Sequence, residues 1–348
     1  MNDLTELERF RAELPDDPAA RAIARRRLVD RTREPQRRSR TPVLARRRLV
    51  LATAAAVVAA GGLVAVDILV LGDQPVGASA EAASLLEQAA ERAIGSSDPV
   101  VGPDEYLRVS TVAVYATTFV SSPPTAVNTW LATYTEELFV PGDPDREWVL
   151  RRSPRVPYRP EDAELAEPYG PPESEGFTER ARDGGFFGEP VTPSWQTPTK
   201  AFLADLPRDP QRLLERIRHD AADAGPSRDG EALVLIADVL RSGIVPGDVR
   251  AALFRAAALI PGVELVDEQA NLNGQVGVAV GRYEPNAGDR QEIIFEPDTG
   301  MVIGERQVLV DRGYGPHLPV GSAIAWTVVA TEVVPASEVD ETPADQMD

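Results

Sequence analysis

The chain contains no cysteine among its 348 residues. Without thiols it has no disulfide bonds, no cysteine nucleophile, no thiolate metal site and no cysteine-linked lipid. A domain outside the cytoplasm would therefore have to be stabilised by packing alone. Lysine is also nearly absent, since Lys200 is the only one beside 35 arginines.

Histidine is scarce as well, because the chain has only His219 and His317. A histidine-based triad or a two-histidine metal site would require both to converge. One lies at the polar end of a predicted helix and the other in a Gly- and Pro-containing turn, so we expect two surface residues.

No recognised catalytic motif is present. The sequence lacks a G-x-S-x-G elbow, a phosphate-binding loop, an H-E-x-x-H helix and an EF-hand loop. Gly274, Gly277 and Gly281 resemble a glycine-rich loop, but valines alternate with them, which is typical of a strand. We therefore predict no catalytic, cofactor-binding or metal-ligating residues.

Acidic pairs do not change this prediction. Neighbouring strand residues face opposite sides of a sheet, so Glu136 with Glu137, or Asp267 with Glu268, cannot present two carboxylates to one substrate. Only a pair brought together by the fold could serve a hydrolase. A calcium site at the turn near Asp298 would have too few oxygen ligands.

Charge divides the chain into two unlike parts. Residues 1–48 hold 14 arginines against 8 acidic residues, whereas residues 72–348 hold 22 basic against 46 acidic residues. An acidic region with a charge of −24 repels phosphate backbones, so we exclude nucleic-acid binding there.

Between these parts lies one long apolar run, residues 49–71, in which Asp67 is the only charge. At about 1.5 Å per residue a helix of this length reaches roughly 34 Å, enough to cross a bilayer. The basic residues Arg46, Arg47 and Arg48 precede it and favour a cytoplasmic N-terminus. We expect a single-pass cell-membrane protein with an extracytoplasmic C-terminal domain.

Two other interpretations of this run stay open. One is a cleaved export signal, because Ala78, Ser79 and Ala80 resemble a cleavage site, although signal cores are about 7 to 15 residues long. The other is a buried soluble helix, which the lack of an amphipathic face disfavours. The sequence does not decide between a retained anchor and a cleaved signal.

The remainder predicts an α+β domain over residues 80–335, joined to the span by a linker at 72–79. Apolar residues recur at helical spacing in some stretches and alternate in others. A block of helices would pack against a curved, half-barrel-like antiparallel sheet. We expect helices at 80–94, 200–206, 210–222, 230–242 and 246–259, and strands at 106–117, 129–140, 147–152, 263–269, 275–284, 290–296, 301–310 and 323–334.

Two segments differ from this pattern. Residues 153–198 hold nine prolines and five glycines, which indicates an excursion that either covers a sheet face or forms a lid over a ligand groove. The acidic residues 336–348 predict a disordered tail. Candidates to line a groove are Trp130, Trp148 and Trp195, although a strand tryptophan is more often a core residue.

Five stretches carry a resemblance: the Arg-rich tail, PRDPQRLL at 207–214, RAALFRAAALIPGV at 250–263, QEIIFEPDTG at 291–300 and VGSAIAWTVVATEVV at 320–334. With them the chain resembles an actinobacterial family of single-span membrane proteins of unknown function, often encoded beside extracytoplasmic-function sigma factors. It is more distantly similar to periplasmic lipoprotein carriers and sigma-regulator sensors. This resemblance implies a half-barrel that binds lipid or a partner.

Three functions follow as hypotheses. The first is a non-enzymatic, membrane-anchored protein that binds a lipid or an envelope partner and signals through its tail to a sigma factor or another cytoplasmic protein. The second is an extracytoplasmic hydrolase that uses a carboxylate pair. The third is a purely structural envelope protein. The sequence predicts no cofactor and leaves the oligomeric state open.

Overall fold

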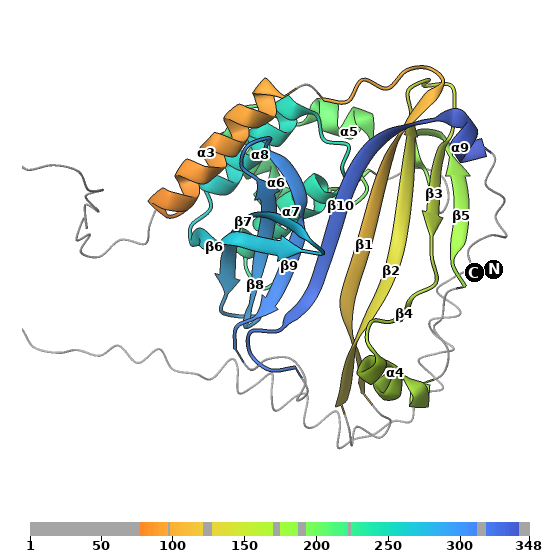
Figure 1. The fold of residues 1–348 in the computed structure, drawn as a ribbon. Helices are drawn as coiled ribbons and strands as arrows, with labels where there is room; N and C mark the ends of the chain where they lie inside the picture. The colour runs from red at the N-terminus through yellow and green to blue at the C-terminus, as the bar shows by residue number, and fades with distance from the viewer. Residues whose placement is uncertain are drawn as a thin grey trace, which may run out of the picture. The chain divides into compact units, whose positions relative to one another are not determined.

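The computed structural model describes residues 77–96, 98–120, 127–169, 175–186, 193–221, 224–311 and 318–340. Along this part of the chain, the first helix is followed by strands with one helix among them, then by four helices, then by five strands and a last helix (Figure 1). The helices are α3 (Ala80–Gly95), α4 (Pro160–Ala166), α5 (Lys200–Asp205), α6 (Pro210–Asp220), α7 (Arg228–Arg241), α8 (Gly247–Ala258) and α9 (Ala336–Asp340).

One antiparallel sheet of ten strands runs through the domain, in the order β5-β3-β2-β1-β10-β9-β8-β7-β6, with β4 paired to β2. It is not closed into a barrel. An α+β domain with a large antiparallel sheet is therefore confirmed. The strands are β1 (Glu105–Val120), β2 (Val127–Pro141), β3 (Trp148–Arg152), β4 (Val156–Pro157), β5 (Phe177–Ala181), β6 (Val263–Leu272), β7 (Gln275–Glu284), β8 (Asp289–Glu296), β9 (Met301–Leu309) and β10 (Ala323–Pro335).

The main hydrophobic core lies between the helices and one face of strands β6 to β8. Alternate residues Ile293 and Phe295 of β8 point into it, and the ring of Phe295 lies 5.2 Å from that of Phe254 on α8. The helices start where their sequences supply caps: the side chain of Asp209 accepts the N–H of Arg212 in α6, for example. The helices that cover this face of the sheet are therefore specified by local features of the sequence, the spacing of apolar residues and the capping residues.

A second, smaller core lies on the opposite face of the sheet. Ile294 of β8 and Val328 of β10 contact Ala270 and Leu272 of β6 there, although β6 is the far edge strand. Two register shifts between β6 and β7 allow this hairpin to turn away from the direction of β8 to β10 (Figure 1).

Residues 153–186 of the predicted excursion are docked on the sheet where the structure describes them. Asp162 of α4 is 1% exposed, and its carboxylate accepts hydrogen bonds from the Leu131 N–H (2.9 Å) and from Arg159 (2.7 Å). Burial would raise the pKa of Asp162, but these hydrogen bonds outweigh it and hold the pKa below its usual value. This buried carboxylate fixes α4 against β2.

Two predicted boundaries need correction. Pro246 is the N-cap of α8 and not its first helical residue. The segment from residue 336 is not disordered at its start, because residues 336–340 form α9 and Val339 is fully buried against Tyr106, Phe139 and Val149. Apolar contact with the sheet outweighs the acidic composition of this segment. Residues 341–348 lie outside the described part.

Among the described residues, no helix combines the length and the apolar character that a bilayer crossing requires. The predicted span at 49–71 and the flanking residues Arg46, Arg47 and Arg48 lie outside the described ranges.

Candidate functional site

The sheet splits between two neighbouring strands. The ladder between β9 and β10 ends at the pair Gly304 and Val328. Beyond this pair β10 continues to Pro335 with β1 as its ladder partner, while Met301 and Val302 pair with β8. The edges of β9 and β10 therefore face each other unpaired over this stretch.

Glycine and a bulge explain where the split begins. Gly304 lies so close to the Thr327 carbonyl oxygen that a β-carbon would overlap it, so the strands can approach closely there. Immediately before Gly304 the register against β8 shifts and leaves Ile303 as an extra residue on β9. A bulge bends its strand, and here β9 leaves β10.

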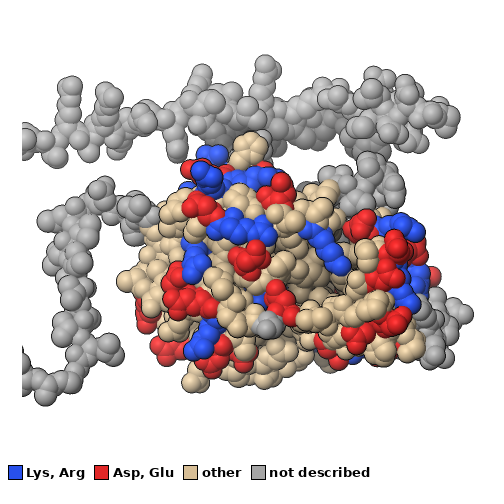
Figure 2. Space-filling view, turned by 90° about the horizontal axis from the view of Figure 1, so that it is seen from above, with Lys and Arg blue, Asp and Glu red and all other residues tan. Residues whose placement is uncertain are grey.

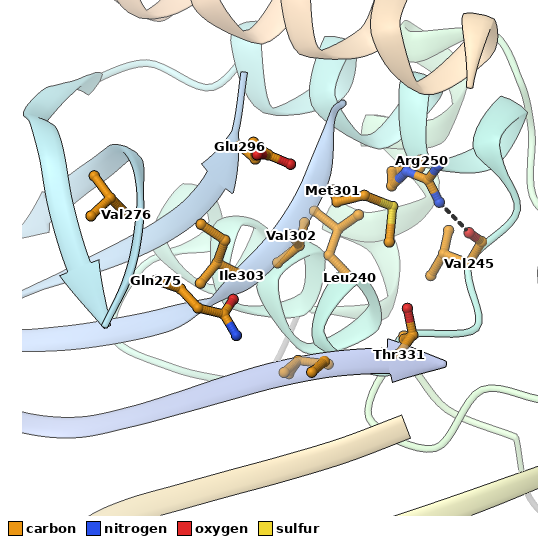
Figure 3. A pocket seen from close by; sticks show the side chains of 13 residues that line it. Leu240, Val245, Arg250, Gln275, Val276, Glu296, Met301, Val302, Ile303 and Thr331 are labelled. Atoms are coloured by element: carbon orange, nitrogen blue, oxygen red, sulfur yellow. Dashed lines mark hydrogen bonds between the residues drawn. The ribbon is translucent and has the colours of Figure 1, made fainter. Parts of the chain in front are cut away.

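A cavity of about 360 Å³ lies at the split between β9 and β10 (Figure 3). Apolar side chains from the helices, from β9 and from β10 line most of it, and Gln275 and Val276 of β7 close one side. Val276 is 55% exposed and lies at the rim. The full lining is Leu240, Gly243, Val245, Arg250, Gln275, Val276, Glu296, Met301, Val302, Ile303, Val329, Ala330 and Thr331.

A second cavity of about 290 Å³ adjoins the first. The two share Gly243, Val245, Arg250, Met301 and Thr331, so we describe them together as the split-sheet cleft. The second cavity adds these residues to the lining: Asp98, Pro99, Val101, Leu107, Val140, Pro141, Gly142, Lys200, Ile244 and Pro246.

Arg250 is the buried cation of the cleft, with 6% exposure. Its guanidinium donates to the Val245 carbonyl oxygen (2.8 Å; Figure 3) and to the Asp98 carboxylate (3.3 Å). Asp98 also accepts the N–H of Gly247 (2.8 Å) and so caps the start of α8. The Nε of Arg250 has no hydrogen-bond partner among the described residues, which leaves one buried donor unsatisfied at this place.

The three predicted groove residues do not line either of these cavities. Trp130 is 8%, Trp148 is 4% and Trp195 is 5% exposed. Trp195 packs edge-on against Phe202, with ring centroids 5.3 Å apart, and its indole N–H donates to Asp220 (3.0 Å). All three are buried, and a buried position is usual for a strand tryptophan such as Trp130 of β2 or Trp148 of β3.

A cluster of buried charges lies between α7 and β9. Arg241 binds Asp238 (2.8 Å) from its own helix and Glu305 (3.0 Å) from the sheet, while Gln291 donates to the second Glu305 oxygen (2.9 Å). Burial, together with the nearby Asp238 carboxylate, raises the pKa of Glu305 to about 7, against the opposing effects of Arg241 and Gln291. Burial also raises the pKa of Tyr115, which faces the same group.

This cluster brings two buried carboxylates together, as a hydrolase hypothesis would require. However, Asp238 and Glu305 share Arg241 as their ion-pair partner, and neither lines the two cavities. Their contacts fit a structural ion-pair network better than an acid and a base facing a substrate.

The one histidine that the structure describes lies outside the cleft. His219 is exposed and contacts its neighbour Asp220, and His317 lies outside the described residues. Among the residues that the structure describes, no three His, Asp or Glu side chains are grouped to hold a metal ion. The cleft therefore offers apolar surface with a few polar groups, an arrangement suited to binding.

Charges on the molecular surface are mixed in sign. Figure 2 shows basic side chains lying among acidic ones on the face that it draws. Arg255 of α8, for instance, pairs with Glu87 of α3 (2.6 Å), and Arg208 pairs with Asp248 (2.8 Å). Neutralised arginines of this kind do not attract a polyanion.

Comparison with known proteins gives no name to this arrangement. No protein-family model matches the chain, and no curated protein matches it. A function for the chain must therefore be inferred from the geometry of the cleft.

Proposed function

We propose that the chain is a non-enzymatic, membrane-anchored binding protein whose extracytoplasmic domain holds an elongated, mainly apolar ligand in the split-sheet cleft. The observation that carries this proposal is the split itself, where one cavity lies between strands that could otherwise have paired. The second cavity continues from it toward Leu107 of β1 and Val140 of β2. A purely structural protein would be expected to fill this space with its own side chains.

The membrane anchor is inferred from residues 49–71, and the orientation from Arg46, Arg47 and Arg48. The arginine-rich tail would then lie in the cytoplasm, where it can contact a sigma factor or another regulatory protein. The resemblance to the actinobacterial family and to half-barrel lipid carriers and sensors supports this arrangement, with a lipid or an envelope partner as ligand.

The topology can be tested with single cysteines, since the wild-type chain provides no thiol background. We expect Val100→Cys, at a position that is 88% exposed, to react with a membrane-impermeant maleimide in intact cells. Ser39→Cys in the tail should react only after the cells are lysed. The opposite labelling pattern, or a mature chain that begins after Ala80, would overturn the anchored topology.

Ligand binding can be tested by filling the cleft. Ala330 is an exposed residue of the lining, so Ala330→Trp should occupy cavity volume without disturbing the core. Native mass spectrometry of the full chain, released from mild detergent, should detect a bound species on the wild type and at least tenfold less of it on the variant.

Val320→Trp is the matched control, because Val320 is 53% exposed and outside the lining of both cavities. It should retain the bound species. A wild-type chain that carries no bound mass, or equal occupancy in both variants, would contradict binding in the cleft.

A further inference from the structure

The split-sheet cleft presents main-chain groups as well as apolar side chains. In a strand, successive residues direct their N–H and C=O groups alternately to the two sides. Residues 329–334 of β10 pair with β1 on one side. On the side that faces β9, their N–H and C=O groups make no backbone hydrogen bond to another described residue in a ladder or a loop. Met301 and Val302 of β9 likewise have their ladder partners on the β8 side alone, and the bulged Ile303 has no ladder partner. The Met301 N–H donates to Thr299 Oγ1 (3.2 Å).

Unpaired backbone groups in a partly buried cleft are unfavourable unless something pairs with them. A hydrocarbon chain offers neither donors nor acceptors. An extended peptide offers both, on both of its edges, and therefore matches two facing strand edges better than an acyl chain does.

The side-chain surfaces of the cleft fit the same occupant. Leu240 and Val245 line it from the helical side, whereas Gln275 and Val276 line it from the β6–β7 hairpin. A strand inserted between β9 and β10 would direct its side chains alternately to these two surfaces. Arg250, whose Nε lacks a partner, supplies one further donor for a peptide carbonyl or carboxylate oxygen.

The outer edges of the sheet carry features that disfavour strand addition, whereas the free run of β10 in the cleft has no register shift. Edge strand β6 carries two register shifts and the exposed acids Glu264 and Glu268, and edge strand β5 has only five residues. Bulges, charges and short length are the usual means of preventing strand addition. Glu332 is the one charged residue on the unpaired run 329–334 of β10.

We propose that the cleft binds an extended peptide segment of a partner protein, which adds as a strand between β9 and β10. This proposal rests on the proposed function and specifies its ligand class. A free run of six residues corresponds to about 20 Å of strand. The preferred segment would carry apolar residues at alternate positions.

The test uses the full chain in nanodiscs and a displayed library of random hexapeptides as the probe. Peptides that bind should lose at least tenfold in affinity for Val276→Asp, which places a charge on the exposed rim of the cleft. Val320→Asp is the matched control, because it changes an equally exposed valine outside the lining and should bind as the wild type does.

Two main-chain measurements then distinguish strand addition from apolar binding. When a selected peptide binds, hydrogen exchange should slow at least tenfold at those amides of residues 302–303 and 329–334 whose N–H groups face the cleft, because the others already face β1 or β8. N-methylation of that peptide should weaken binding at neighbouring positions alike where both strands flank it, because one N–H faces β10 and the next faces β9.

The outcomes separate this proposal from the proposed function. If no peptide is selected in a cleft-dependent way, or if N-methylation weakens binding at no position, strand addition is wrong. If palmitate instead occupies the cleft and leaves the exchange of these amides unchanged, the cleft is a lipid site and the proposed function stands. If neither probe binds, both proposals fail.

Discussion

Replacing Gly300 by alanine should destabilise the domain by about 3 kcal/mol, although the change adds a single methyl group. Gly300 ends the turn between β8 and β9 with φ of 66°, and a left-handed residue with a β-carbon costs about 1–2 kcal/mol. The new atom would also overlap the Ala89 carbonyl oxygen and lie 2.9 Å from the Ala93 nitrogen of α3. Overpacking of this kind adds about 1–3 kcal/mol.

Gly274 provides the matched control for this substitution. It too has a positive φ, 90°, in the turn between β6 and β7, but a β-carbon there would meet no atom within 4 Å. Gly274→Ala should therefore lose only the conformational part, about 1 kcal/mol. Guanidinium denaturation of the full chain, followed by tryptophan fluorescence, measures both changes. If both variants lose the same free energy of unfolding, α3 does not pack closely against the β8–β9 turn.

Replacing Glu305 by glutamine should have a comparably large effect, with the opposite sign and only at higher pH. The Glu305 side chain is 13% exposed, and burial together with Asp238 raises its pKa to about 7 from the ordinary value of 4.5. In the unfolded chain the group ionises near 4.5, so the folded state loses stability as the pH rises from about 4.5 to about 7. Above pH 7 this loss is complete.

A pKa difference of this size corresponds to about 3 kcal/mol. Glu305→Gln keeps the shape and removes the charge, while Arg241 keeps Asp238 as its partner. We therefore expect the variant to be about 3 kcal/mol more stable than the wild type at pH 8 and nearly equal to it at pH 5. Denaturation midpoints at several pH values test this expectation.

Glu164→Gln serves as the control, because Glu164 is an exposed residue of α4 and its charge stays in water. Its stability should follow that of the wild type at every pH. If the wild type and Glu305→Gln respond to pH in parallel, Glu305 is ionised without penalty and Arg241 compensates for its burial.

The sequence specified most of the secondary structure of the described domain. Alternation in residues 106–117 and helical spacing in residues 210–222 predicted β1 and α6 to within a few residues of their ends. Such patterns are local, because a strand repeats every two residues and a helix every 3.6.

Local patterns were less informative where long-range contacts outweigh composition. The acidic segment from residue 336 predicted disorder, yet burial of Val339 holds residues 336–340 as α9. Trp130, Trp148 and Trp195 were candidates for a groove, and the fold places them at core positions. Which apolar residues are covered depends on the packing of distant elements.

By itself, therefore, the sequence determined the alternation of elements, the antiparallel class of the sheet, the absence of thiol chemistry and the separation of a basic tail from an acidic region. Only the tertiary structure decided where the sheet splits. Gly304 and Thr327, or Asp98 and Arg250, are far apart along the chain, and no local pattern couples them. The cleft forms because the hydrogen-bond ladder between β9 and β10 ends at Gly304 and Val328, while both strands continue beyond this pair.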